Sequence, residues 1–142
     1  MNEAMENSAT NDTGWTPIPL PLKILFVVLV LWIVGAVMNL PNLMENGLPL
    51  FGNFVFGMSA AFIVLLLDIL GPSIFLFALW TRKSWAVIWA FAYIGIFILN
   101  NMVALFTVRA ELGLPQILGP TIAGLVFLVV IFWKRSYFKQ TH

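Results

Sequence analysis

The chain has 142 residues, of which 61% are apolar, 15% aromatic and only 9% charged. A soluble domain is about 45–50% apolar and about 25% charged. A chain this short also keeps too much of its surface in water to hide so many large apolar side chains. The composition therefore excludes an ordinary soluble domain and a disordered chain, and it predicts an integral membrane protein.

The charges and the reactive side chains exclude several classes of function. Seven basic residues against six acidic ones give a net charge of +1, without the clustered basic face of a nucleic-acid-binding protein. The chain has no cysteine, so disulfides, thiolate nucleophiles and cysteine-ligated metals are excluded. Its only histidine is the last residue, His142, which argues against imidazole catalysis and histidine metal sites. We predict that the protein is not an enzyme and has no cofactor, no metal site and no nucleic-acid partner.

Residues 1–21 are polar and mildly acidic, and they end with prolines at every second position, Pro17, Pro19 and Pro21. A secretory signal would begin with a basic region and end at a cleavage site of small residues. Neither pattern is present here. The segment is therefore interpreted as a short N-terminal tail, and the apolar run after it as a retained membrane span.

Four apolar runs follow, and a helix needs roughly 20 residues at about 1.5 Å each to cross a bilayer. The first run is expected to stop at Pro41, and the second is long and has a candidate bend at Gly71 and Pro72. The fourth is slightly short unless it begins near Leu114. The predicted fold class is all-α, a bundle of four transmembrane helices. The spans are residues 22–40, 54–80, 85–107 and 117–133 of a domain covering 22–133, followed by a basic C-terminal tail, 134–142.

The orientation follows from the basic residues. With four spans, six of the seven fall on one side of the membrane, and only Arg109 falls on the other. The positive-inside rule makes the basic side cytoplasmic, and it places both termini there. Four tryptophans gather at the same boundary, as in an interfacial aromatic belt. The six basic residues are Lys23, Arg82, Lys83, Lys134, Arg135 and Lys139; the tryptophans are Trp15, Trp80, Trp85 and Trp133.

The two connections on the opposite side share the pattern E-x-G-L-P. It begins at Glu45 in one connection and at Glu111 in the other, 66 positions later. One interpretation is a duplicated helical hairpin, with the repeats related by an axis along the membrane normal. The other is that glycine and proline simply end one membrane helix and begin the next. The poor alignment of the helices favours the second interpretation.

Asp68 is the one acidic residue inside a predicted span. It lies roughly 18 Å from the basic side, where a charge costs at least about 2.5–3.5 kcal/mol. Helical spacing puts it on a stripe of small residues, and Pro72 would deprive the Asp68 carbonyl of its helical hydrogen bond. This position is a candidate proton or cation site. The alternatives are a carboxyl group that ties two helices together and a contact with another subunit. The stripe comprises Gly57, Ala61, Val64, Asp68 and Gly71.

The third predicted span offers partners for this acid. Tyr93 and Asn100 lie on one stripe of that span and bracket the depth of Asp68. We predict a hydrogen bond from one of them to Asp68, with Asn100 slightly favoured because its amide can both donate and accept. Asn101 points away from that stripe, toward another helix or a second protomer.

Three further charges, Glu45, Arg109 and Glu111, lie in the connections opposite the basic side. They are interpreted as solvated loop charges, and any ion pair among them would contribute little energy. The alternative is a divalent-cation site formed by the two carboxylates with loop carbonyls.

These observations leave two main functional hypotheses, well ahead of an intramembrane enzyme, for which only Asp68, Tyr93 and the two asparagines could do chemistry. The first is a non-catalytic accessory, assembly or regulatory subunit of the plasma (inner) membrane, which binds a partner through its transmembrane helices. The second is a homo-oligomeric transporter or channel that uses Asp68 as its proton or cation site. In both, the partners are the lipid bilayer and either further copies of the chain or a larger membrane complex.

Overall fold

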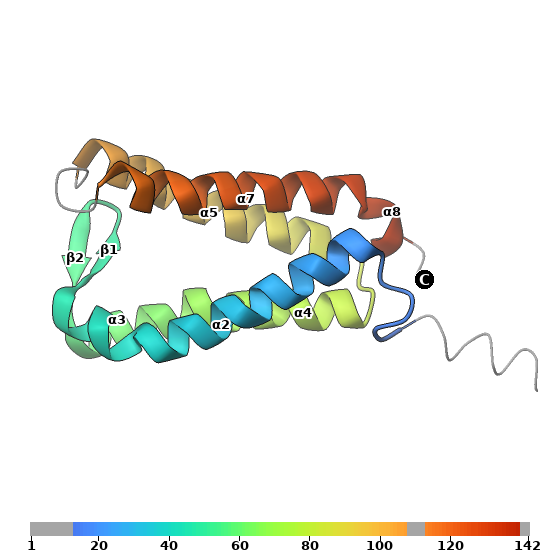
Figure 1. The fold of residues 1–142 in the computed structure, drawn as a ribbon, viewed down its shortest axis with the longest axis horizontal. Helices are drawn as coiled ribbons and strands as arrows, with labels where there is room; N and C mark the ends of the chain where they lie inside the picture. Colours follow the sequence, from blue (N-terminus) through green and yellow to red (C-terminus); the bar gives the residue numbers. More distant parts are fainter. Residues whose placement is uncertain (1–12, 108–112, 140–142) are drawn as a thin grey trace, which may run out of the picture.

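The computed structural model of the protein describes residues 13–107 and 113–139 (Figure 1). Four helical segments in this part of the chain are long and apolar enough to cross a membrane, as predicted. They are α2 (Leu20–Asn46), the composite segment Gly57–Trp80, α5 (Ala86–Thr107) and α7 (Leu114–Trp133). The composite segment consists of α3 (Gly57–Val64), the π-helix η1 (Leu65–Leu70) and α4 (Gly71–Trp80).

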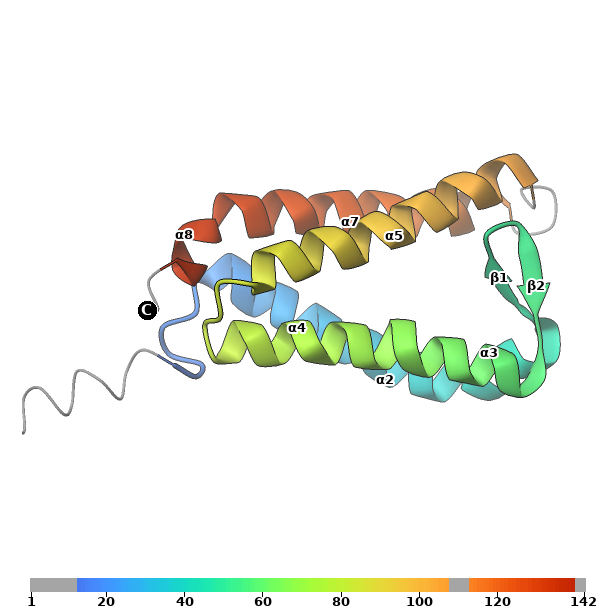
Figure 2. The ribbon, with the colours of Figure 1, turned by 180° about the vertical axis from the view of Figure 1, so that it is seen from behind.

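The helices form two antiparallel pairs. In one pair α2 packs along α3, η1 and α4, and in the other α5 packs along α7. Figures 1 and 2 show that the pairs meet where α2 begins and α7 ends, and that they diverge toward the opposite end. We call the first the basic end, because the six predicted basic residues lie there, in the helices that start or finish at this end or in the segments directly beside them. The opposite end is the hairpin end.

A β-hairpin bridges the two diverging pairs (Figure 2). Strands β1 (Leu48–Leu50) and β2 (Asn53–Val55) pair antiparallel. Phe51 and Gly52 form the two-residue turn with φ of 45° and 84°, the left-handed conformation that type I′ hairpin turns require. The expectation of a purely helical chain is therefore corrected here. Residues 54 and 55, assigned to the second span, belong to a strand.

The first helix was expected to stop at Pro41, but it continues to Asn46. Proline inside a membrane helix is tolerated, because neighbouring groups and local adjustments satisfy the carbonyl that it leaves without a donor. The helix ends at Gly47, which has a φ of 93° and donates its N–H to the Leu43 carbonyl at 3.0 Å. Glycine is favoured at this position because a left-handed φ strains other residues.

The two E-x-G-L-P loops share one backbone feature and then differ. Gly47 and Gly113 have nearly the same φ and ψ, 93° and 146° against 78° and 151°. After Gly47 the chain enters strand β1, whereas after Gly113 it enters helix α7. The two loops therefore have the same backbone conformation at the glycine, but the segments after the glycine have different secondary structure.

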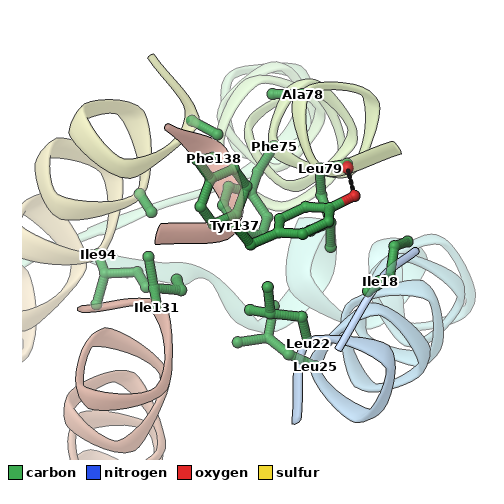
Figure 3. Packing of buried hydrophobic residues seen from close by; sticks show 12 residues of the cluster. Ile18, Leu22, Leu25, Phe75, Ala78, Leu79, Ile94, Ile131, Tyr137 and Phe138 are labelled. Carbon is green, nitrogen blue, oxygen red and sulfur yellow. Dashed lines mark hydrogen bonds between the residues drawn. The ribbon is translucent and has the colours of Figure 1, made fainter. Parts of the chain in front are cut away.

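The main core lies at the basic end and includes the C-terminal segment, as Figure 3 shows. Residues 134–142 were expected to form a basic tail, but Arg135–Phe138 form a helical turn, α8, that buries Tyr137 and Phe138. These rings contribute apolar area that a free tail would leave in water. The core comprises Ile18, Leu22, Leu25, Phe75, Ala78, Leu79, Ala86, Ala90, Ile94, Ile131, Tyr137 and Phe138.

Candidate functional site

The candidate polar site lies on the π-helix η1. The Gly71 N–H donates to the carbonyl of Leu66, five residues back, where an α-helix would use the fourth. At this spacing the carbonyl opposite Pro72 is that of Leu67, and Pro72 has no N–H to offer it. The hydroxyl of Tyr93 donates to this Leu67 carbonyl. The α-helical spacing predicted that Pro72 would leave the Asp68 carbonyl without its main-chain donor. In the π-helix this carbonyl is instead that of Leu67, and it accepts its hydrogen bond from another helix.

Asp68 is half-buried, and its carboxyl accepts a hydrogen bond from α2. The indole Nε1 of Trp32 donates to Asp68 Oδ1 at 3.2 Å. The predicted bond from Tyr93 or Asn100 is therefore wrong. The additional residue in a π turn changes the direction in which side chains leave the helix, so a stripe drawn at α-helical spacing does not hold through η1. Within the described residues Trp32 is the single hydrogen-bond donor to this carboxyl.

Trp32 was not among the predicted site residues, although its position carried a signal. A tryptophan needs an acceptor for its indole N–H when it is buried, and it usually lies at the membrane interface. Trp32 instead lies near the middle of α2. A tryptophan at that depth indicates a polar partner on a neighbouring helix, and Asp68 is the acid in the middle of a span.

The predicted bend residues form a close helix–helix contact. A Cβ atom at Gly71 would clash with the ring of Tyr93, so the side chain of α5 occupies the space that any larger residue would need. The Nε1 of Trp89, one turn earlier on α5, donates to the Gly71 carbonyl at 3.1 Å. Gly71 and Pro72 thus mark where α5 packs against the end of the π-helix.

The two asparagines of α5 have different partners. The side-chain carbonyl of Asn100 accepts the N–H of Phe51 at 2.7 Å, which fixes the β-hairpin to the hairpin end of α5. Asn101 donates through Nδ2 to Thr121 Oγ1 of α7 at 3.1 Å, so it faces another helix of the same chain. Neither residue belongs to the Asp68 site.

An apolar cavity of about 140 Å³ lies between α2, α4, α5 and α7. Trp32 and Tyr93 both contribute to its wall. The Asp68 carboxyl is hydrogen-bonded to the first of these residues, and the second donates its hydroxyl to the carbonyl of Leu67, the residue before Asp68. The polar site therefore adjoins the cavity. Composition and spacing gave no indication of this cavity.

The predicted charges at the hairpin end are described only in part. Glu45 lies in the last turns of α2, whereas Arg109 and Glu111 fall outside the described residues. Residues 13–107 and 113–139 contain no group of three histidine, cysteine, aspartate or glutamate side chains placed to hold a metal ion.

Comparisons of the chain with protein-family models, with curated proteins and with solved structures find no match. The chemistry of the site therefore rests on its geometry. A carboxyl group in the middle of a span, with one indole donor and further acceptor capacity, can accept a second hydrogen bond or exchange a proton.

Proposed function

We propose that this protein is a non-catalytic integral membrane subunit that binds a partner's transmembrane helix beside Asp68 and Trp32. The observation that carries the proposal is the half-buried Asp68 carboxyl in the middle of a span, with a single donor in the described chain. Trp32 itself is 43% exposed, so the pair lies at the side of the bundle and not inside the core.

A half-buried carboxyl group that is partly open to hydrocarbon is costly, whether it is ionised or protonated. A donor from a neighbouring helix reduces that cost, and polar side chains are a recognised means of associating membrane helices. The oxygen lone pairs that Trp32 does not use give a partner helix a specific place to bind. Partner binding also explains why an acid lies in the middle of a span.

The test compares Asp68→Leu with Asp68→Asn. The tagged protein is purified from native membranes in a mild detergent, and the stoichiometry of the co-purified partner is measured. Asparagine keeps an acceptor for Trp32 and for the partner, so the complex should survive; leucine removes the acceptor, so the complex should be lost. Ser59→Leu, which changes an exposed polar residue of α3 in the same way, is the matched control. Purification of the wild-type protein alone would contradict the proposal.

A second candidate function is proton- or cation-coupled transport by a homo-oligomer, with Asp68 as the coupling site. It is favoured by the position of the carboxyl beside the cavity between the two helix pairs. Transport requires a group that gains and loses a proton or cation, and asparagine cannot do so. Flux through proteoliposomes should therefore disappear in Asp68→Asn, the variant that the partner-binding proposal tolerates. Flux that persists in this variant would exclude a coupling role for Asp68.

For either function we propose that the protein lies in the plasma membrane with the basic end in the cytoplasm. Cations at this end lie over aromatic rings: Lys23 Nζ is 5.4 Å from the Trp15 ring and Lys134 Nζ is 4.0 Å from the Trp133 ring. Lysine beside tryptophan is typical of a membrane interface, and an excess of lysine and arginine is typical of its cytoplasmic side.

A further inference from the structure

The wall of the cavity combines deeply buried and exposed side chains. Its inner wall includes Phe75 and Ile94, which are 3% and 9% exposed and belong to the core at the basic end. Its lining is apolar almost throughout, so water inside it would find few hydrogen-bond partners. Packed interiors contain few voids of this size, because the atoms around a void lose dispersion contacts.

The cavity opens between α2 and α7. Of the lining residues, Val28 and Trp32 on α2 and Pro120 and Ala123 on α7 are exposed. Val28 is eight residues from the start of α2, or about 12 Å along the helix, and Pro120 is six residues from the start of α7, or about 9 Å. In a bilayer this opening therefore faces hydrocarbon, away from both polar interfaces.

We infer that this cavity is a binding site for the acyl chain of a membrane lipid, which inserts sideways between α2 and α7. The volume of about 140 Å³ is close to that of an apolar cavity of about 150 Å³ that holds one benzene molecule. It therefore accommodates the end of a chain and not a whole lipid. The inserted methylene groups would restore the missing dispersion contacts and leave the headgroup at the interface.

This inference does not rest on the partner-binding proposal, although Trp32 lies both beside the Asp68 carboxyl and at the opening of the cavity. The two tests therefore change other residues: Asp68 is outside the cavity lining, and Val28 lines the cavity without bonding to the carboxyl. Asp68→Leu can lose the partner and keep the lipid site, and Val28→Trp can lose the lipid site and keep the partner. The two ideas can fail separately.

The test uses phosphatidylcholine with a photoreactive diazirine near the end of one acyl chain. The full-length protein is reconstituted in phosphatidylcholine vesicles that contain this lipid, illuminated, and mapped by peptide mass spectrometry. Adducts are expected on Phe75 and Ile94, which bulk lipid cannot reach, as well as on the exposed Ile88. Leu79 is fully buried but does not line the cavity, and it should carry none.

Two variants on α2 form a matched pair. Val28→Trp enlarges an exposed residue at the opening without requiring space in the core, whereas Val27→Trp enlarges its exposed neighbour outside the cavity lining. Adducts on Phe75 and Ile94 should fall about tenfold in the first variant, which corresponds to about 1.4 kcal/mol of binding free energy. They should not change in the second, and labelling of Ile88 should persist in both.

Three outcomes would overturn the inference. The first is the absence of adducts on Phe75 and Ile94 in the unmodified protein. The second is an equal yield of these adducts in Val28→Trp and Val27→Trp. The third is labelling of Leu79 at the level of Phe75, since the probe would then reach buried positions that do not line the cavity.

Discussion

Single residues in this protein are constrained by their neighbours on other helices more than by their own helix. Gly71 is an example, because its sequence context with Pro72 indicates a bend, whereas the structure places the Tyr93 ring against its Cα. Asp68 could be identified from sequence as the acidic residue in the middle of a predicted span. The mid-helix position of its partner Trp32 indicated some polar contact, but the pairing with Asp68 depends on the direction in which side chains leave the π-helix.

Gly71→Ala should therefore destabilise the protein. The added methyl group must displace the Tyr93 ring and weaken its hydrogen bond to Leu67, and overpacking of this kind typically costs about 1–3 kcal/mol. Gly95→Ala on α5 is the control, because nothing lies within 4 Å of its added Cβ atom. Unfolding free energies in mixed micelles measure both effects. Equal stability of the two variants would show that the ring does not restrict position 71.

At the scale of elements, the sequence predicts where helices lie better than where an α-helix changes to a π-helix or where a short strand occurs between helices. The third span was predicted as residues 85–107 and α5 covers Ala86–Thr107, because apolar length is a direct property of the sequence. The π-helix could not be predicted, since its i+5 bonds depend on compensation from α5. The β-hairpin was missed because its strands are three residues each and contain too few positions to show alternation.

The π-helix provides a double-mutant test. Tyr93→Phe removes the donor to the Leu67 carbonyl and should cost about 0.6 kcal/mol, the average for hydrogen bonds between membrane helices, and at most about 1.7 kcal/mol. Pro72→Ala restores a main-chain N–H that can serve the same carbonyl. Tyr93→Phe should therefore cost less in the Pro72→Ala background than in the wild type. Additive unfolding free energies would mean that Pro72 and Tyr93 do not serve the same carbonyl.

Helix α8 is held at the basic end through its residue Tyr137, which contacts Arg82 and Leu79. Arg82 Nε donates to the Tyr137 carbonyl at 2.6 Å and its guanidinium lies over the ring at 4.7 Å, while the Tyr137 hydroxyl donates to the Leu79 carbonyl at 3.2 Å. Burial raises the pKa of the Tyr137 phenol above its ordinary value of 10.0, and the nearby charge of Arg82 offsets part of this rise. Tyr137 and Phe138 of the C-terminal segment are therefore packed within the core.

The pKa of Tyr137 gives a prediction for alkaline solutions. Because the folded pKa is raised, the stability that Tyr137 contributes is complete below pH 10 and is lost as the pH rises through the folded pKa, since the unfolded phenol ionises first. The chain has two tyrosines, so Tyr137 can be titrated alone in Tyr93→Phe by the ultraviolet absorbance of tyrosinate. The midpoint should lie above 10. A midpoint at or below 10 would contradict burial of the phenol by α8.

At the scale of the whole molecule, packing is concentrated at the basic end. The large core cluster and α8 lie there, whereas the hairpin end has a small cluster around Ala104 and Ile117 and is bridged by the β-hairpin. The lengths of the apolar runs predicted four helices, because hydrocarbon requires length and apolarity from each span separately. They could not predict the divergence of the two pairs, or the cavity between them, because these depend on how side chains from four helices fit together.

The orientation of the molecule is directly testable, because the chain has no cysteine and single-cysteine variants therefore have no background. Ser84→Cys lies in the exposed connection between α4 and α5 at the basic end, and Asn53→Cys lies on the exposed start of β2 at the hairpin end. If the basic end is cytoplasmic, a membrane-impermeant maleimide should label Asn53→Cys in intact bacterial cells. It should label Ser84→Cys only after the cells are opened. Labelling of Ser84→Cys in intact cells, with Asn53→Cys protected, would invert the orientation and mean that the positive-inside rule does not govern this chain.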